Sequence, residues 1–332
     1  MARIGIVGGG SWGTALAETL ARCGHQSNIY VRREKLAREI NNNNINHDYF
    51  PEYKLSAQIQ ATNSLQQAVE YGSYIMLAVP THVLRETADK ISQYHIQDKI
   101  IISTAKGIEE KSFMRNSEII SGLGFENIVV LSGPTHAEEV IEGNPSAAVV
   151  AAEEIKQAQE VQQLLMSKTF RIYTSTDLCG VELAGAVKNI IAIAAGIAAG
   201  LGYGDNTRAA LVTRGLAEIR RLGSRLGGKS RTFSGLAGLG DLVVTCGSQH
   251  SRNFRFGYHI GQGLNSQQAR EKIGQVVEGI KTTAAVYNMV QQKSFNIELP
   301  ITKQIYMVLF DHKSPLQAVD ELMLRDPKRE LE

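Results

Sequence analysis

The sequence has few cysteines, and no two of them are close together. Its three cysteines, Cys23, Cys179 and Cys246, are odd in number and far apart, and no CxxC motif occurs. Neither a disulfide framework nor a thiolate zinc site is indicated, and we expect no bound metal. This pattern is typical of a reducing compartment, so we expect a cytoplasmic location.

The sequence also lacks an excess of either charge. It has 35 Lys and Arg residues against 33 Asp and Glu, a net charge of +2. This balance gives no electrostatic argument for a nucleic acid or an anionic membrane as partner. Any anion site must therefore be local, and a small molecule is the expected ligand.

Long apolar runs are missing as well. The longest, residues 190–204, is shorter than the roughly 18 residues that suggest a membrane span. Its alanines and glycines suit a helix buried among other helices. At the N-terminus, Arg3 precedes apolar residues, but Glu18 and the glycines interrupt any signal-peptide core. We expect neither a signal peptide nor a membrane-spanning chain.

What is present predicts two folded domains. The chain has 332 residues, of which 43% are hydrophobic and 20% charged, and two domains of roughly 150 residues are the usual division. In the first half, β-branched runs alternate with helical patterns, which predicts a doubly wound, mostly parallel α/β sheet of the Rossmann type, with helices on both faces. After about Asp177 the patterns are helical. We therefore expect an α/β domain over residues 1–180 and an all-α domain over residues 181–332.

The expected elements follow these patterns. The strands are Ile4–Val7, Ile29–Val31, Tyr74–Val79, Ile100–Ser103, Ile128–Leu131, Ala147–Ala151 and Phe170–Thr174. The helices are residues 14–23, 33–40, 82–93 and 154–166 in the first half, and 180–201, 207–226, 266–274, 278–292 and 301–310 in the second. Glycine-rich connectors separate the later helices, and residues 235–257 are expected to form a glycine-rich loop region.

The motif Gly8-x-Gly10-x-x-Gly13 lies between the first strand and the first helix. In this context Gly8 allows a tight turn, Gly10 lets the backbone approach a pyrophosphate, and Gly13 allows close packing of helix and strand. The free N–H groups of the helix start then bind the phosphate charge. The alternative is a turn with no ligand, but the strand and helix around the motif favour a dinucleotide site.

Two arginines indicate which dinucleotide is preferred. NAD-specific sites usually carry Asp or Glu after the second strand, where it binds the ribose 2′-hydroxyl. Here the strand ends in Arg32 and Arg33, whose guanidinium groups suit a 2′-phosphate. NADP(H) is therefore the expected preference, with NAD(H) possible. The alternative is that both arginines simply begin a solvated helix.

Four stretches carry polar residues that packing alone does not require. Lys106 follows one strand and Gly133 and Thr135 follow another, at the strand ends where open α/β sheets bind ligands. Lysine is almost never fully buried unless it is paired, yet Lys188 occurs in a small, apolar helix. The fourth stretch is glycine-rich. The full set is Lys106, Gly133, Thr135, Lys188, Asn189, Asp241, Thr245 and Arg252.

Each of these residues also has a simpler interpretation. Lys106 could be a surface cation, and Lys188 could extend from its helix to water. Asp241 could cap the segment that follows it. Arg252 could belong to a solvated basic patch with Arg255. Together, however, two lysines, a carboxylate and an arginine form a set suited to an anionic substrate.

Longer motifs resemble NAD(P)-dependent glycerol-3-phosphate dehydrogenase of the bacterial type. The resemblance rests on GGGSWGTALA, VPTHVL, AKGIE, SGPTHAEE, ELAGAVKNIIAIAAGIAAGLGYGDNTRAALVTRGLAEI, GLAGLGDLVVTC, SRNFRFG and IGQVVEG, in this order along nearly the whole chain. It implies a Rossmann domain and a helical domain, usually in a homodimer. It also implies reversible hydride transfer between NAD(P)H and dihydroxyacetone phosphate, mostly toward sn-glycerol 3-phosphate for phospholipid synthesis.

The resemblance also implies roles for individual residues. The cofactor would contact Gly8, Gly10, Ser11, Trp12, Gly13, Arg32, Arg33, Lys106, Ala137, Arg252, Val276 and Glu278. The substrate would contact Lys106, Gly133, Thr135, Lys188, Asn189, Asp241, Thr245, Ser251, Arg252 and Asn253. Lys188 would transfer the proton, with Lys106 and Asp241 as the other catalytic residues. His136 departs from the family, which usually has an aromatic residue there, and we do not assign it as a catalytic base.

The chemistry of lysine agrees with this interpretation. Its ordinary pKa of about 10.4 is too high for a base, but burial and a second ammonium lower it.

Two other classes of protein share some of these sequence features. A ketopantoate reductase or hydroxyacid dehydrogenase would share the fold and Lys188 but would not need Arg252 for a phosphate. A non-catalytic NADPH sensor would have no need of both Lys188 and Asp241.

Overall fold

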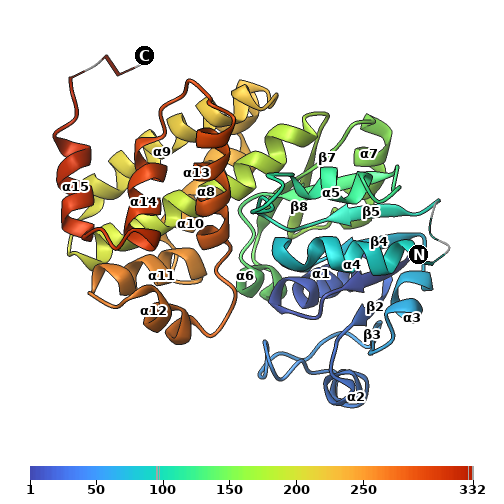
Figure 1. Ribbon diagram of the computed structural model, residues 1–332. Coiled ribbons are helices and arrows are strands. Elements are labelled where there is room, and N and C mark those ends of the chain that lie inside the picture. The colour runs from blue at the N-terminus through green and yellow to red at the C-terminus, as the bar shows by residue number, and fades with distance from the viewer. Residues whose placement is uncertain (95, 97, 328, 331–332) are drawn as a thin grey trace.

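The computed structural model shown in Figure 1 describes residues 1–94, 96, 98–327, 329 and 330. Its N-terminal part is built on an eight-stranded sheet with the order β3-β2-β1-β4-β5-β6-β7-β8. Neighbouring strands are parallel, except that β6 and β7 are antiparallel. The strands are β1 (Arg3–Val7), β2 (Gln26–Tyr30), β3 (Ile59–Thr62), β4 (Tyr74–Leu77), β5 (Ile100–Ser103), β6 (Ile128–Ser132), β7 (Ser146–Ala152) and β8 (Phe170–Ser175).

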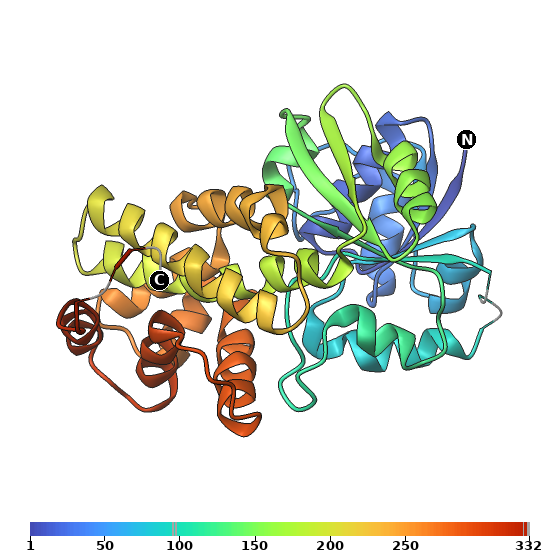
Figure 2. The same ribbon diagram turned by 90° about the horizontal axis from the view of Figure 1, so that it is seen from above.

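Helices cover both faces of the sheet, as the two views show (Figures 1 and 2). Successive side chains of a strand point to opposite faces. In β1, Ile4 and Ile6 share a core with Leu16 of α1, whereas Val7 shares a second core with Leu84 of α4. The helices of this part are α1 (Ser11–Arg22), α2 (Glu34–Asn43), α3 (Leu65–Glu70), α4 (Thr81–Ser92), α5 (Asn116–Ser121), α6 (Ala137–Glu142) and α7 (Ile155–Leu165).

The C-terminal part is helical and packs around α8 (Leu178–Gly200), which lies at its centre (Figure 1). Around it lie α9 (Asp205–Arg225), η1 (Ser230–Ser234), η2 (Leu236–Gly240), α10 (Asp241–Gly247), α11 (Arg252–Gly261), α12 (Ser266–Ile273), α13 (Glu278–Gln292), α14 (Pro300–Phe310) and α15 (Pro315–Met323). Residues 328, 331 and 332 of the predicted helical domain lie outside the described residues. The predicted Rossmann and helical architectures are both confirmed.

Helix α8 was predicted over residues 180–201 and extends from Leu178 to Gly200. It is longer than the apolar run 190–204, and by length and composition alone its 23 residues could cross a membrane. However, 94% of its most apolar window is buried inside the structure, as in the core helix of a globular protein.

Glycines allow α8 and α11 to cross in close contact. A Cβ at Gly196 would lie 2.0 Å from the carbonyl oxygen of Phe254, and a Cβ at Gly257 would lie 2.1 Å from that of Ile193. Only glycine permits such an approach of two backbones. The contact holds α11 beside the C-terminal half of α8.

This contact also explains why residues 235–257 were wrongly expected to form a loop. The structure has η2, α10 and the first half of α11 in this segment. The glycines there serve packing as well as turns, since a Cβ at Gly238 would lie 2.0 Å from the carbonyl oxygen of Phe233. Strand β3 was also missed, because its four residues alternate apolar and polar side chains over too short a length to stand out.

Candidate active site

Elements from both parts of the chain bring Lys106, Lys188 and Asp241 together. Lys106 follows the carboxyl end of β5, Lys188 lies in the middle of α8, and Asp241 is the first residue of α10. Lys188 Nζ donates to Asp241 Oδ1 at 2.5 Å, and Lys106 Nζ donates to Asp241 Oδ2 at 2.8 Å. One carboxylate therefore joins the two ammonium groups.

The surroundings of this cluster change the acidity of its members. Lys188 is 5% exposed, so it does not extend to water. Burial lowers the pKa of Lys188 to about 8, with Asp241 opposing this shift and Lys106 adding to it. Burial disfavours the charged form of Asp241, but the two lysines nevertheless hold the pKa of its carboxyl below the ordinary value. Lys188 can therefore exchange a proton near neutral pH.

Each lysine keeps one donor free of protein partners among the described residues. An ammonium group has three N–H donors. Besides Asp241, Lys188 Nζ donates to Thr245 Oγ1 at 2.6 Å and Lys106 Nζ donates to the carbonyl oxygen of Gly133 at 2.8 Å. Two ammonium groups against one carboxylate also leave one positive charge uncompensated. The cluster can thus bind an oxygen of an anionic molecule.

The predicted polar residues around the cluster are fixed by further hydrogen bonds. Thr245 Oγ1 donates to the carbonyl oxygen of Asp241 at 2.5 Å, one helical turn back. Thr135 Oγ1 donates to the carbonyl oxygen of Gly133 at 3.1 Å. Asp241 does not cap a helix, since its carboxylate is directed to the lysines. These bonds set the orientation of the cluster before any ligand binds.

A second series of hydrogen bonds runs from the cluster to the start of α13. Asn189 Nδ2 donates to the carbonyl oxygen of Lys106 at 3.0 Å, and Asn189 Oδ1 accepts from Asn253 Nδ2 at 3.0 Å. Asn253 Oδ1 accepts from the N–H of Gly279 at 2.9 Å. The two asparagines therefore tie α8 to α11 and α13.

Arg252 lies at the N-terminus of α11, one residue after Ser251. The hydroxyl of Ser251 caps the helix by accepting from the N–H of Phe254 at 3.2 Å. Arg252 is partly buried, and no side chain among the described residues forms an ion pair with it. Burial raises the pKa of nearby Glu278 to about 6, while a backbone N–H and the charge of Arg252 act against this shift. The guanidinium group is free to bind an anion.

The glycine turn has the features of a pyrophosphate site. Gly8 has a φ of +117°, and a Cβ at Gly13 would lie 1.9 Å from the carbonyl oxygen of Gly8. A Cβ at Gly10 would meet only the ring of Tyr49, at 3.9 Å. No side chain caps α1, and its first turn, which includes Ser11 and Trp12, carries no acidic residue. These residues fit a dinucleotide with its phosphates at the start of α1.

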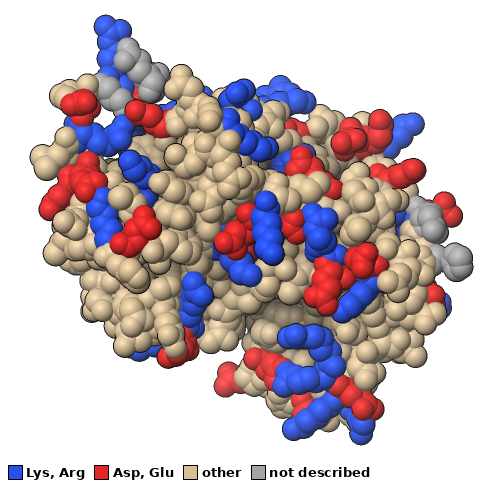
Figure 3. All heavy atoms as spheres, in the orientation of Figure 1, with Lys and Arg blue, Asp and Glu red and all other residues tan. Residues whose placement is uncertain are grey.

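The two arginines after β2 are exposed and lie just before α2. Arg33 forms an ion pair with Asp48, and Arg32 has no side-chain partner among the described residues. Figure 3 shows side chains of both charges interspersed over this segment. Arg32 is available to bind a 2′-phosphate. Arg33 would have to leave Asp48 in order to bind the same phosphate.

Two contacts near these sites were not predicted. The N–H of Thr81, at the start of α4, donates to Glu278 Oε1 at 3.1 Å. Thr81 lies shortly after the end of β4, and Pro80 precedes it in the chain. The position of a polar residue just past a strand end, which indicated Lys106, therefore also applies to Thr81. Tyr49 lies over Gly10 in the segment 44–56, and no local signal marks it.

Two other predicted residues, Ala137 and Val276, lie at or near helix starts, and the unassigned His136 precedes one of these helices. Ala137 is the buried first residue of α6, Val276 is exposed just before α13, and His136 is the residue that precedes α6. Burial lowers the pKa of His136 to about 4, and the charges of Lys188 and Lys106 add to the shift. At neutral pH its imidazole is therefore uncharged.

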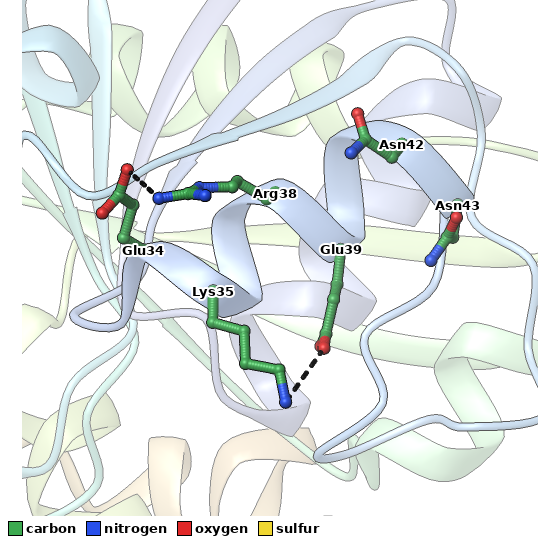
Figure 4. Close-up of a pocket in the computed structure, with 6 residues that line it drawn as sticks. All are labelled: Glu34, Lys35, Arg38, Glu39, Asn42 and Asn43. Carbon is green, nitrogen blue, oxygen red and sulfur yellow. Dashed lines mark ion pairs between the residues drawn. The ribbon is translucent and has the colours of Figure 1, made fainter.

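A pocket elsewhere on the surface lies along α2 and carries none of this chemistry (Figure 4). It is lined by Glu34, Lys35, Arg38, Glu39, Asn42 and Asn43. Glu34 pairs with Arg38 at 2.6 Å and Lys35 with Glu39 at 3.8 Å, so its charges are matched within one helix. Within the described residues, no group of three or more His, Cys, Asp or Glu side chains could hold a metal ion.

Comparison with known proteins identifies the family. The chain matches two family models, NAD-dependent glycerol-3-phosphate dehydrogenase N-terminus over residues 3–158 and C-terminus over residues 177–320. It is 56% identical over 330 residues to glycerol-3-phosphate dehydrogenase (NAD(P)+) of Halothermothrix orenii, covering 99% of this chain and 97% of that protein. A crystal structure of glycerol-3-phosphate dehydrogenase from Coxiella burnetii has a TM-score of 0.93 and 38% identity, covering 98% of this chain and 99% of that one. The chain therefore belongs to the NAD-dependent glycerol-3-phosphate dehydrogenase family, which consists of oxidoreductases.

Proposed function

We propose that the protein interconverts dihydroxyacetone phosphate and sn-glycerol 3-phosphate with NAD(P)(H), and that Lys188 transfers the proton. The observation that carries this proposal is the buried cluster in which Asp241 joins Lys188 and Lys106. When bound, the nicotinamide supplies or accepts the hydride. What the chain must supply is binding, orientation and one proton.

Lys188 meets the requirements of a general acid and base. In reduction, its free N–H faces the substrate carbonyl and gives up a proton as the oxygen becomes an alcohol. In oxidation, neutral Lys188 takes that proton back. A pKa of about 8 keeps both forms accessible near neutral pH. Asp241 orients the amine, and the second ammonium of Lys106 stabilises the negative charge that develops on the oxygen.

The substrate phosphate is assigned to the start of α11. Arg252 offers a forked cationic donor, and Ser251 and Asn253 lie on either side of it in the chain. Asn189 and Asn253 are hydrogen-bonded to each other, which connects this anion site to Lys188 on α8. Gly133, Thr135 and Thr245 complete the proposed substrate contacts. This second anion site distinguishes the proposal from reductases of unphosphorylated substrates.

The cofactor is assigned to the glycine turn and the start of α1, through Gly8, Gly10, Ser11, Trp12 and Gly13. The further cofactor contacts proposed are Arg32, Arg33, Lys106, Ala137, Arg252, Val276 and Glu278. NADP(H) is proposed as the preferred form, because guanidinium groups and no carboxylate directly follow β2. We further propose that flux runs toward glycerol 3-phosphate for phospholipid synthesis, in a cytoplasmic homodimer with a domain boundary near residue 180.

The test is a spectrophotometric assay of NADPH absorbance with the purified protein. We expect NADPH to be consumed only when dihydroxyacetone phosphate is added, with the reverse change for NADP+ and glycerol 3-phosphate. Dihydroxyacetone without phosphate should be a poor substrate. Binding of NADPH without any turnover would support the sensor alternative and overturn the proposal.

A further inference from the structure

Lys106 lies on a segment without regular secondary structure, so neither a helix nor the sheet holds it at Asp241. Residues 104–107 follow β5 and belong to no helix or strand. A group that takes part in a reaction must stay within about 0.5 Å of its working position. The hydrogen bonds made by the backbone of this segment therefore decide where Lys106 is held.

Two asparagine amides bind three consecutive carbonyl groups of the segment. Asn116 Nδ2 donates to the carbonyl oxygen of Ala105 at 3.0 Å and, more weakly, to that of Gly107 at 3.4 Å. Asn189 Nδ2 donates to the carbonyl oxygen of Lys106 between them. Within the described residues no other group donates to these three carbonyls. Asn116 is buried, and its two amide N–H groups serve the two carbonyls that flank Lys106.

The position of Asn116 is itself fixed by a contact between α5 and α8. Arg115 and Ser117, on either side of it in the chain, both bind the carboxylate of Glu182 on α8. Arg115 Nη1 donates to Glu182 Oε2 at 2.6 Å, and the N–H of Ser117 donates to Glu182 Oε1 at 2.8 Å. The Glu182 side chain is buried. This contact holds the start of α5 against α8.

Helix α8 thereby supports Lys106 by two routes. Glu182 and Asn189 are seven residues apart, so they lie about two turns apart on one face of α8. A Cβ at Gly185 would lie 3.5 Å from Cγ of Lys106, so the stem of the lysine packs on the same helix. Lys188 is the neighbour of Asn189 in the chain. Both ammonium groups of the cluster are therefore positioned relative to α8.

We propose that Asn116 is a positioning residue for the reaction, because it holds the backbone on both sides of Lys106 and so keeps the ammonium group at Asp241. This inference rests on the proposed function, in which the Lys106 ammonium stabilises the negative charge that develops on the substrate oxygen. Without the amide, the carbonyls of Ala105 and Gly107 lose their donor, and the segment can shift together with Lys106.

The experiment is a double-mutant cycle in the NADPH assay with dihydroxyacetone phosphate. Asn116→Leu keeps a side chain of similar size but removes the amide donors. We expect it to lower kcat by about 10–100-fold, because a displacement of about 1 Å in an active site costs up to about 100-fold. If Asn116 acts through Lys106, the same substitution in the Lys106→Met protein should lower kcat by no more than about twofold further.

The pH profile of glycerol 3-phosphate oxidation supplies a second measurement, which a loss of stability alone would not change. Burial lowers the pKa of Lys188 to about 8, and the charge of Lys106 adds to this shift. When Lys106 moves away, the pKa of Lys188 rises, so the pH of half-maximal oxidation should rise above about 8 in Asn116→Leu. The titratable groups whose charges act on Lys188 are Asp241 and Cys246 of α10, Lys106 and His136.

Gln162→Met is the matched control. Gln162 Nε2 donates to the carbonyl oxygen of Ile172 at 2.8 Å, so it is also an amide that holds a backbone carbonyl, but it connects α7 to β8. This variant should keep the wild-type kcat and pH profile. The melting temperature of each variant checks folding, and Asn116→Ala replaces Asn116→Leu if the latter does not fold.

Two results with an active wild-type protein would overturn the inference. Unchanged kcat and pH profile in folded Asn116→Leu would mean that Lys106 stays in place without the amide. Equal losses in the wild-type and Lys106→Met backgrounds would mean that Asn116 acts by another route. If the wild-type protein does not turn over dihydroxyacetone phosphate at all, the proposed function fails and this inference fails with it.

Discussion

Replacing Lys188 with methionine removes the proposed proton donor while keeping a long, apolar side chain in the same space. The structure supports a large effect because the pKa of Lys188 is near 8. At pH 7 about one tenth of such lysines are neutral, against about one in 2,500 for a lysine with its ordinary pKa of about 10.4. The wild-type side chain can therefore act in both directions, and the variant in neither.

We expect Lys188→Met to lower kcat by about 10²–10⁴-fold in both directions, the usual contribution of a general acid or base. NADPH binding, followed by the fluorescence of the bound nicotinamide, should stay within about twofold of wild type, because a catalytic proton carrier contributes to the transition state rather than to cofactor binding. Removing one member of a buried ion cluster also weakens folding. The melting temperature must therefore be measured beside kcat, at a temperature where the variant is folded.

Lys99→Met is the matched control. Lys99 Nζ donates to the carbonyl oxygen of Val69 at 2.7 Å, and burial lowers the pKa of this lysine as well, but it lies outside the cluster. It should keep wild-type kcat. Near-normal turnover by folded Lys188→Met would remove this residue from the mechanism. Equal losses in the two variants would show that a general effect of losing a hydrogen-bonded, at least partly buried lysine had been measured.

Three further perturbations test the remaining parts of the site. Asp241→Asn removes the negative charge that raises the pKa of the buried lysine, so the pH at which glycerol 3-phosphate oxidation reaches half its maximum should fall below about 8; an unchanged pH profile would contradict the coupling. Replacing Arg32 and Arg33 together by glutamine should raise KM for NADPH far more than for NADH, because only NADPH carries the 2′-phosphate. Equal changes with both cofactors would assign the pair a structural role. Arg252→Ala should lower kcat/KM for dihydroxyacetone phosphate by about 10–150-fold and Arg252→Lys by less, with little effect on dihydroxyacetone; proportional losses on both substrates would refute the assignment.

Most strands of the sheet could be predicted, because buried parallel strands consist of short runs of β-branched residues. Ile100–Ser103 is an example, with all four residues buried. What local patterns could not show is the use of glycine in α11, where Gly257 packs against α8. A glycine that allows a turn and one that allows two helices to touch look the same in the sequence.

The candidate site was predictable to the extent that it depends on strand ends. Lys106, Gly133 and Thr135 each follow a strand, and the structure joins Lys106 to Gly133 by a hydrogen bond. Thr81 obeys the same rule and was overlooked. Asp48 obeys no such rule, because the segment 44–56 brings it to Arg33 only in the folded chain. Its contact could not be inferred from spacing.

The acidity of Lys188 is likewise a property of the whole fold rather than of its helix. A lysine in an isolated amphipathic helix would reach water and keep its ordinary pKa. Here the packing of α10 and α11 against α8 excludes water, and the chain that follows β5 brings a second ammonium to the same carboxylate. Asp241, shared by both lysines, sets how far the shift goes. The sequence can show that a lysine lies among small apolar residues, but the proximity of Lys106 and Asp241 follows only when both parts of the chain pack on α8.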